Sequence, residues 1–205
     1  MSIYFFEKEV FKSMKTNQSR SVTKQIATTA ILLAICIASQ FLKNLSVYIT
    51  GPIVNLCLIL AVMTAGLMWG LILAVITPLT AFIIAASPVM TAVPGIIPLI
   101  MLGNAVIVVG VNFLFKPAVE KSNTIFGVRQ IIMAVLSCLA KGCIMGLTIA
   151  LWLLPTFIPE ASSLRNKMPV FQTMFSITQF VTALIGFVYF YIVWKPIKNI
   201  LKLNA

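Results

Sequence analysis

Apolar residues fall into six long runs along the chain, separated by polar or proline-rich segments. The runs cover residues 26–42, 53–67, 71–86, 99–115, 131–154 and 170–194. A helix needs about 20 mostly apolar residues to cross a hydrocarbon core roughly 30 Å thick. The second and third runs are shorter than this, so we expect their helices to tilt or to share a shallow turn at residues 66–70. The pattern predicts six membrane-spanning helices, or five if two of the runs form a re-entrant pair.

The sequence predicts the local structure of three of the segments that connect the runs. Residues 44–52 are expected to form a polar loop. Residues 87–98 contain three prolines and a glycine, which predicts irregular backbone. This segment is stiff and apolar, as suits a lid that excludes water. Residues 155–169 form a longer polar loop bounded by prolines, and either of the last two segments could gate a site.

Residues 1–24, before the first run, lack the pattern of a signal peptide, because two glutamates interrupt them and no cleavage site follows. Apolar residues recur there at helical spacing (Ile3, Phe6, Val10 and Met14). That spacing is typical of an amphipathic helix on a membrane surface, although a disordered tail or a start codon placed too far upstream fits equally well. The expected organisation is an N-terminal tail (1–24), a six-helix membrane domain (25–198) and a short C-terminal tail (199–205).

The amino-acid composition indicates which class of protein contains these six runs. Apolar residues make up 60% of the chain and charged residues 9%, against about 45–50% and 25% in soluble domains. We therefore expect an all-α integral membrane protein. The chain has no histidine, and its four acidic residues are all glutamates. A Ser-His-Asp triad, an aspartyl dyad and a histidine metal site are thus excluded, and we expect neither an enzyme nor a metal or cofactor.

The basic residues predict the orientation. Eleven of the 15 lysines and arginines precede the first run, lie in the loop between the fourth and fifth runs, or follow the sixth. Only Lys43, Arg165 and Lys167 belong to the opposite side. The positive-inside rule then places both termini in the cytoplasm. The net charge of +11 reflects this signal and affinity for anionic membrane lipid. The basic residues are spread over three segments, so we expect no nucleic-acid partner.

The first run carries small residues at helical spacing. Ala30, Ala34 and Ala38 are four residues apart, so they form one flat strip on a helix, which we call the alanine strip. Small residues in such a strip allow a second helix to approach closely inside a membrane. The spacing alone fits either a contact within the bundle or a surface for a partner protein.

The order of motifs along the chain resembles a known family. After the alanine strip, a Gly-Pro pair opens a short helix (ITGPIVNLCLILAVMTAGLMWG), and TPLTAFII and a proline-rich loop lead into IIPLIMLGNAVIVV. This layout is similar to that of the substrate-binding S components of energy-coupling factor (ECF) transporters. The resemblance extends over about residues 22–198 and rests on layout, since the motifs themselves are loose.

The resemblance implies a function and partners. S components lie in the cytoplasmic membrane of prokaryotes and capture a vitamin or related micronutrient at their outer face. They then associate with a transmembrane coupling subunit and two cytoplasmic ATPases. By resemblance, Ala30, Ala34 and Ala38 would meet the coupling subunit. The solute would bind between the outer halves of the fourth to sixth helices, under the loops that follow the first, third and fifth. This chain has no Walker A motif, so ATP hydrolysis would belong to the partners.

Lys141 is the one charge inside a predicted helix. Eleven residues beyond Gln130, it should lie about 16 Å from the cytoplasmic end. A lysine at that depth costs about 2.5–3.5 kcal/mol on insertion scales, so it should face a ligand or a polar interior. An anionic substrate, such as a carboxylate, would be its natural partner. The alternative is a structural lysine held by backbone carbonyls and by Gln or Asn side chains.

Other polar residues lie at comparable depths in the predicted helices. Thr148 and Trp152 follow Lys141 on one helical face, and Gln172 and Gln179 share a stripe on the last helix. The candidate substrate contacts are therefore Lys141, Gln179, Asn104, Asn55, Thr148, Trp152 and Gln172. Intramembrane amides need hydrogen-bond partners whether or not a ligand binds. Trp152 could stack on a ring or anchor the helix at the membrane interface.

Two functions of different classes remain open at this point. The leading hypothesis is the substrate-capturing subunit of an ECF-type importer. The alternative is a structural membrane protein that scaffolds a cell-envelope complex and uses Lys141 only to brace the bundle. A secondary transporter working alone is disfavoured, because the helices lack the carboxylates that usually couple protons or sodium and no inverted repeat is visible.

Overall fold

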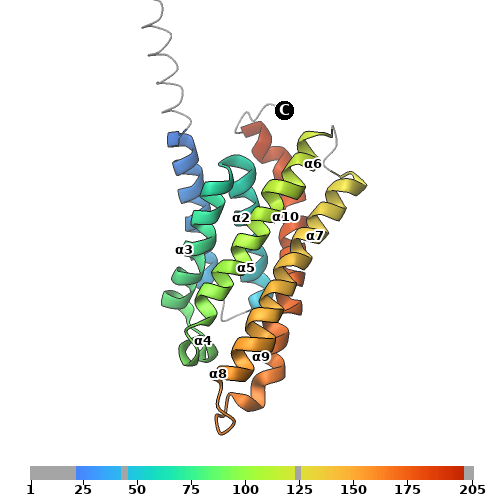
Figure 1. Ribbon diagram of the computed structural model, residues 1–205. Helices are drawn as coiled ribbons and strands as arrows, with labels where there is room; N and C mark the ends of the chain where they lie inside the picture. Colours follow the sequence, from blue (N-terminus) through green and yellow to red (C-terminus); the bar gives the residue numbers. More distant parts are fainter. Residues whose placement is uncertain (1–21, 43–45, 123–125, 201–205) are drawn as a thin grey trace, which may run out of the picture.

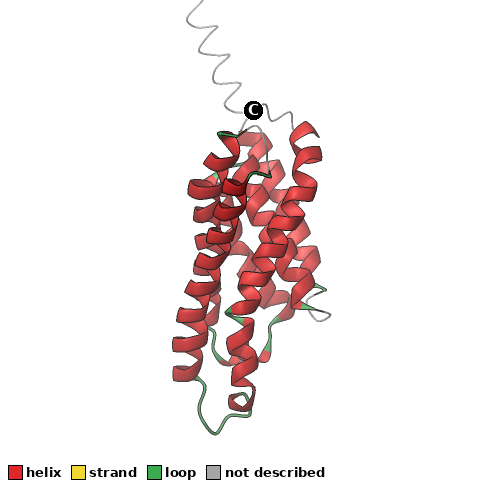
Figure 2. Cartoon of the chain, turned by 90° about the vertical axis from the view of Figure 1, so that its right-hand side faces the viewer, coloured by secondary structure: helices red, strands yellow, loops and turns green. Residues whose placement is uncertain are grey.

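The computed structural model describes residues 22–42, 46–122 and 126–200, and these residues form an elongated bundle of helices (Figure 1). Only helices and loops occur in these ranges (Figure 2). Six helical stretches are long and apolar enough to cross a membrane: Val22–Gln40, Val47–Thr64, Leu67–Ala85, Ile96–Glu120, Val128–Phe157 and Arg165–Lys198. The predictions of an all-α membrane fold and of six spans, not five, are confirmed. The chain is a multi-pass membrane protein.

The bundle has two distinct ends. The Val22–Gln40 helix begins at the same end at which α6 (Lys116–Glu120) and the last turns of α10 (Ile177–Ile200) lie, and we call it the terminal end (Figure 1). The short helices α4 (Pro88–Ala92), α8 (Leu154–Phe157) and α9 (Met168–Met174) lie at the opposite end, the capped end. The described basic residues of the terminal end are Lys24, Lys116, Lys121, Arg129, Lys195 and Lys198. The charge asymmetry expected from the sequence therefore coincides with the two ends of the bundle.

The predicted polar loop at residues 44–52 is wrong from Val47 onward, because α2 already spans Val47–Thr64. Ser46 caps this helix: its hydroxyl accepts a hydrogen bond from the backbone N–H of Tyr48 at 3.1 Å. Pro52 lies within the helix, close enough to the start that only one early backbone bond is lost. The turn to α3 (Leu67–Ala85) is tight, since Gly66 has a φ of 101°, a conformation that favours glycine.

The later spans are compound helices. α5 (Ile96–Gly110) continues through a π-helical stretch, Val111–Phe115, into α6. α7 (Val128–Met145) continues through a second π-helical stretch, Gly146–Leu153, into α8. The predicted sixth span is present, but it is interrupted: α9 ends at Met174 and α10 begins at Ile177.

The segments expected to be irregular are partly helical. α4 and α9 each begin with a proline at the first or second position, where a missing backbone N–H costs no hydrogen bond. α8 also has an early proline, but it continues directly from the Gly146–Leu153 stretch. Between α8 and α9 only a short 3₁₀ turn, Arg165–Lys167, interrupts the loop. The first described residue, Val22, already lies in the first helix, so the predicted domain boundary at residue 25 stays a prediction. The expected amphipathic tail falls at positions 1–21 outside the described residues, as does the end of the C-terminal tail.

The apolar core is divided into two clusters. The larger one joins the Val22–Gln40 helix, α2, α3, α5, α7 and α10. The second joins α4, α8 and α9 to the beginning of α5 and to the Gly146–Leu153 stretch, so it lies in the capped half. α2 and α10 pack closely because Gly186 leaves no room for a side chain: a Cβ there would lie 2.8 Å from Cβ of Asn55.

Candidate functional site

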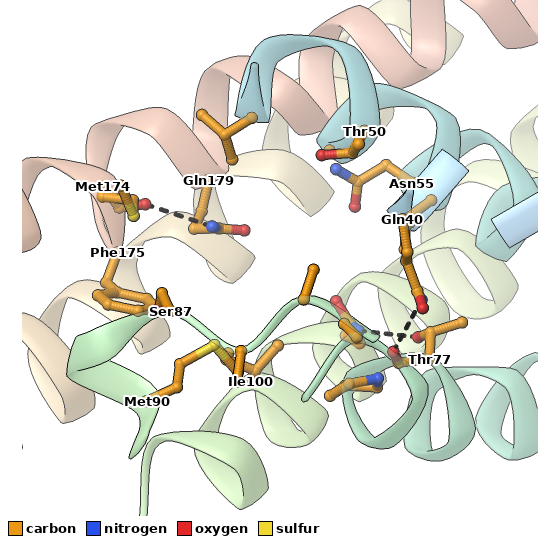
Figure 3. A pocket seen from close by; sticks show the side chains of 18 of the residues that line it. Gln40, Thr50, Asn55, Thr77, Ser87, Met90, Ile100, Met174, Phe175 and Gln179 are labelled. Carbon is orange, nitrogen blue, oxygen red and sulfur yellow. Dashed lines mark hydrogen bonds between the residues drawn. The ribbon is translucent and has the colours of Figure 1, made fainter. Parts of the chain in front are cut away.

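A cavity of about 430 Å³ lies in the capped half of the bundle. It is bounded by the end of the Val22–Gln40 helix, the start of α2, the end of α3, α4, the start of α5, the middle of α7 and the α9–α10 junction. Its volume is within the roughly 300–1,000 Å³ typical of small-molecule sites. On one side of the cavity Figure 3 shows a group of polar side chains, Gln40, Thr50, Asn55 and Thr77.

Lys141 lies in the wall of this cavity and is almost completely buried, with 2% of its surface exposed. Its Nζ donates hydrogen bonds to Oδ1 of Asn55 at 2.7 Å and to Oδ1 of Asn104 at 2.9 Å. An ammonium group has three protons, so one remains for a further acceptor. No carboxylate lies among the lining residues, and Lys141 forms no salt bridge in the described part of the chain. The site therefore presents a buried positive charge held only by neutral amides.

Close helix packing brings these three residues together. Gly103, beside Asn104, faces Met145 of α7, and an added Cβ there would overlap the Met145 Cγ. Gly186 of α10 makes the corresponding close contact at Asn55 of α2. These two glycines allow α5 and α2 to approach the rest of the bundle closely enough for both amides to reach one ammonium group. Substitution at either position would separate the helices that build the site.

A second set of hydrogen bonds continues from Asn104 toward the Val22–Gln40 helix. Nδ2 of Asn104 lies 3.4 Å from the hydroxyl of Thr77. Gln40 donates from Nε2 to the Thr77 carbonyl at 3.1 Å and to the Thr80 hydroxyl at 3.0 Å. Oε1 of Gln40 is buried and has no hydrogen-bond partner among the described residues. The polar side thus links three helices and retains one unsatisfied acceptor.

The opposite side is mainly apolar: Met90, Ile100, Met174 and Phe175 lie there, together with Ser87 and Gln179 (Figure 3). Gln179 of α10 lies beside Met174 on this side. Its Nε2 donates to the carbonyl of Met174 at 3.3 Å, and its oxygen points into the cavity (Figure 3). Met90 and Phe175 also belong to the core cluster of the capped half, so the cavity is continuous with the packing of that end.

Four of the seven predicted contacts line the cavity: Lys141, Asn55, Asn104 and Gln179. The other three do not. Thr148 donates its hydroxyl proton to the carbonyl of Ile144, Gln172 donates to the carbonyl of Ala150, and Trp152 is 57% exposed. The prediction that Thr148 and Trp152 share a face with Lys141 assumed a regular α-helix. The π-helical stretch Gly146–Leu153 bonds i to i+5 and changes that register.

Several lining residues were not among the predicted contacts, chiefly Gln40, Thr50, Thr77 and Phe175. Gln40 and Thr77 are polar residues at the edge of or within apolar runs, which is the signal that could have found them. Thr50 falls in the segment 44–52, which the sequence predicts to be a loop, and Phe175 cannot be distinguished from other core aromatics by sequence.

The alanine strip lies on the outside of the bundle. Ala30, Ala34 and Ala38 are all exposed, and so are Ile31 and Ile35 on the same helix. The strip is therefore not used for a helix contact within the described part of this chain.

Comparison of the chain with protein families, with curated proteins and with solved structures finds no match. Within the described residues, no three His, Cys, Asp or Glu side chains gather as a potential metal site. The cavity and the alanine strip are therefore the features of the molecule that bear on its function.

Proposed function

We propose that this protein is the substrate-capturing subunit of an ECF-type importer in the cytoplasmic membrane of a prokaryote. The observation that carries the proposal is the cavity with Lys141 in its wall. A buried ammonium without a carboxylate partner is unfavourable for folding alone, and intramembrane charges generally mark functional sites. An anionic vitamin-like ligand would supply the missing negative charge and use the remaining proton of Lys141.

The position of the cavity fits capture from outside. It lies in the half of the bundle away from the terminal end, where the basic residues gather. If the positive-inside rule holds, the terminal end faces the cytoplasm and the cavity lies toward the external side. α4, α8 and α9 then form the cover through which the solute enters.

The exposed alanine strip supports the second half of the proposal, association with a coupling subunit. A flat strip of small residues gives little contact area to lipid chains but lets another helix pack backbone to backbone. The coupling subunit and two ATPases would provide the energy for import, and this subunit would catalyse no reaction itself.

The direct test is to look for the solute. The protein is purified in mild detergent from cells that express its natural partners, then denatured, and the released small molecules are identified by mass spectrometry. We expect one anionic compound at near-equimolar amount from the wild type and much less from Lys141→Met. A protein that releases no small molecule and co-purifies with cell-envelope proteins would instead be a scaffold.

A further inference from the structure

The cavity contains hydrogen-bond acceptors as well as the ammonium of Lys141, and these acceptors restrict the chemistry of its ligand. The first is Oε1 of Gln40, a residue only 3% exposed. The amide orientation is fixed by its neighbours, because the Thr77 carbonyl can only accept and must face Nε2. Oε1 is therefore turned away from these partners, and within the part of the chain that the structure describes it is buried without a hydrogen bond. A hydrogen bond stabilises a buried acceptor, so a donor on a ligand would be favourable at this position.

The second acceptor is Oε1 of Gln179. Because Nε2 of Gln179 donates to the carbonyl of Met174, the amide turns its oxygen into the cavity (Figure 3). Asn55 and Asn104 behave differently: both turn their oxygens to Lys141, which only donates. The cavity thus combines one cation with two neutral acceptors, on different helices.

The charges of the lining residues also restrict the charge that the ligand can carry. Lys141 is the single cation among the lining residues, and no Asp or Glu is among them. One ammonium matches a monoanion, whereas a dianionic phosphate would bury an uncompensated charge. A ligand ammonium would have no carboxylate to pair with and would be repelled by Lys141.

We infer that the ligand is a small monocarboxylate that carries a neutral N–H or O–H donor and no cationic group. This inference rests on the proposed function and specifies its substrate class. The carboxylate binds Lys141, the neutral donor satisfies Gln179 or Gln40, and the body of the molecule packs on Met174 and Phe175. Free α-amino acids and amines are excluded as substrates.

The inference is tested by affinity selection with mass spectrometry on the full-length protein in detergent. The probe is a size-matched library in four classes: monocarboxylates with a neutral donor, monocarboxylates without one, zwitterions that carry an ammonium, and neutral or cationic compounds. We expect the first class to dominate the bound fraction. Preferential enrichment of any other class, or no enrichment of the first, overturns the inference.

The best-enriched carboxylate and its N- or O-methylated analogue then test whether Gln179 accepts a hydrogen bond from the ligand. Gln179→Leu should weaken binding of the parent compound about 3- to 10-fold, the value of one neutral hydrogen bond. It should leave the methylated analogue, which has lost the donor, nearly unaffected. Gln25→Leu is the control, because Gln25 bonds Trp69 outside the cavity and should change neither affinity. If Gln179→Leu and Gln40→Leu both bind the parent like the wild type, the acceptor role is refuted.

The two proposals fail in different ways. If another chemical class is enriched, the protein still captures a solute and only the substrate class is wrong. If no compound of any class binds, and purified protein releases no small molecule, the proposed function itself is contradicted.

Discussion

Replacing Lys141 by methionine removes the ammonium from the cavity wall while keeping a long, unbranched side chain. The wild-type Nζ lies within 2.9 Å of two amide oxygens and forms no salt bridge in the described part of the chain. A ligand carboxylate in this site would therefore rely on Lys141 for its charge. Without it, the carboxylate would be buried unpaired.

The expected loss follows from that burial. Truncating one partner of a buried, hydrogen-bonded charge pair costs about 2–5 kcal/mol. This corresponds to about thirty-fold to several-thousand-fold weaker binding. Lys141→Arg should restore only part of the affinity, because the planar guanidinium is larger and places its donors differently.

Stability has to be measured separately, because methionine leaves Oδ1 of Asn55 and of Asn104 without their donor. Each orphaned acceptor costs about 1–3 kcal/mol, and loss of the buried charge offsets part of this cost. Lys141→Gln is the better matched variant: its amide N–H groups can still donate to an asparagine oxygen, but it carries no charge. We expect Lys141→Gln to fold as stably as the wild type and to lose affinity as strongly as Lys141→Met.

The assay is equilibrium binding of the released or selected carboxylate to the isolated subunit in detergent. Thermal unfolding of each variant is recorded in the same buffer. Uptake assays would mix binding with coupling and are not suitable here. If Lys141→Gln is folded and binds within about threefold of wild type, Lys141 only braces the bundle, and an anionic substrate is refuted.

Three further predictions follow from the fold. Ala34→Trp should abolish complex assembly and uptake while ligand binding by the isolated subunit stays near wild type; loss of folding as well would place the strip inside the bundle. Single cysteines at Ser122 and Ser163, in a background without the native cysteines, should be labelled from the cytoplasmic and external sides respectively, and reversed labelling would put the cavity on the wrong side for import. Gly186→Ala should destabilise the protein by about 1–3 kcal/mol in thermal unfolding, since the new Cβ would overlap α2, whereas Gly95→Ala, 3.6 Å from the nearest side-chain atom, should be near neutral.

The architecture could be predicted because it depends on run length and charge. Six apolar runs were sufficient to predict six spans, and the first and last of these helices both reach the terminal end of the bundle. Intramembrane polar residues were equally visible: Lys141, Asn55, Asn104 and Gln179 were chosen because a polar group at that depth needs a partner.

What the sequence could not predict depends on local backbone geometry. The π-helical stretch Gly146–Leu153 turns Thr148 and Trp152 away from the cavity, and no residue pattern marks such a stretch. The break before Ile177 similarly separates Gln172 from Gln179. The pairing of Lys141 with amides of two other helices depends on close contacts at Gly103 and Gly186, which only three-dimensional packing reveals.

Native mass spectrometry of the protein, gently extracted from cells that contain its partners, tests the central proposal most directly. The proposal predicts an assembly of this chain with one further membrane subunit and two ATPases, and a small-molecule adduct of one carboxylate on the isolated chain. A chain that appears alone or with cell-envelope proteins, and without any adduct, would contradict it.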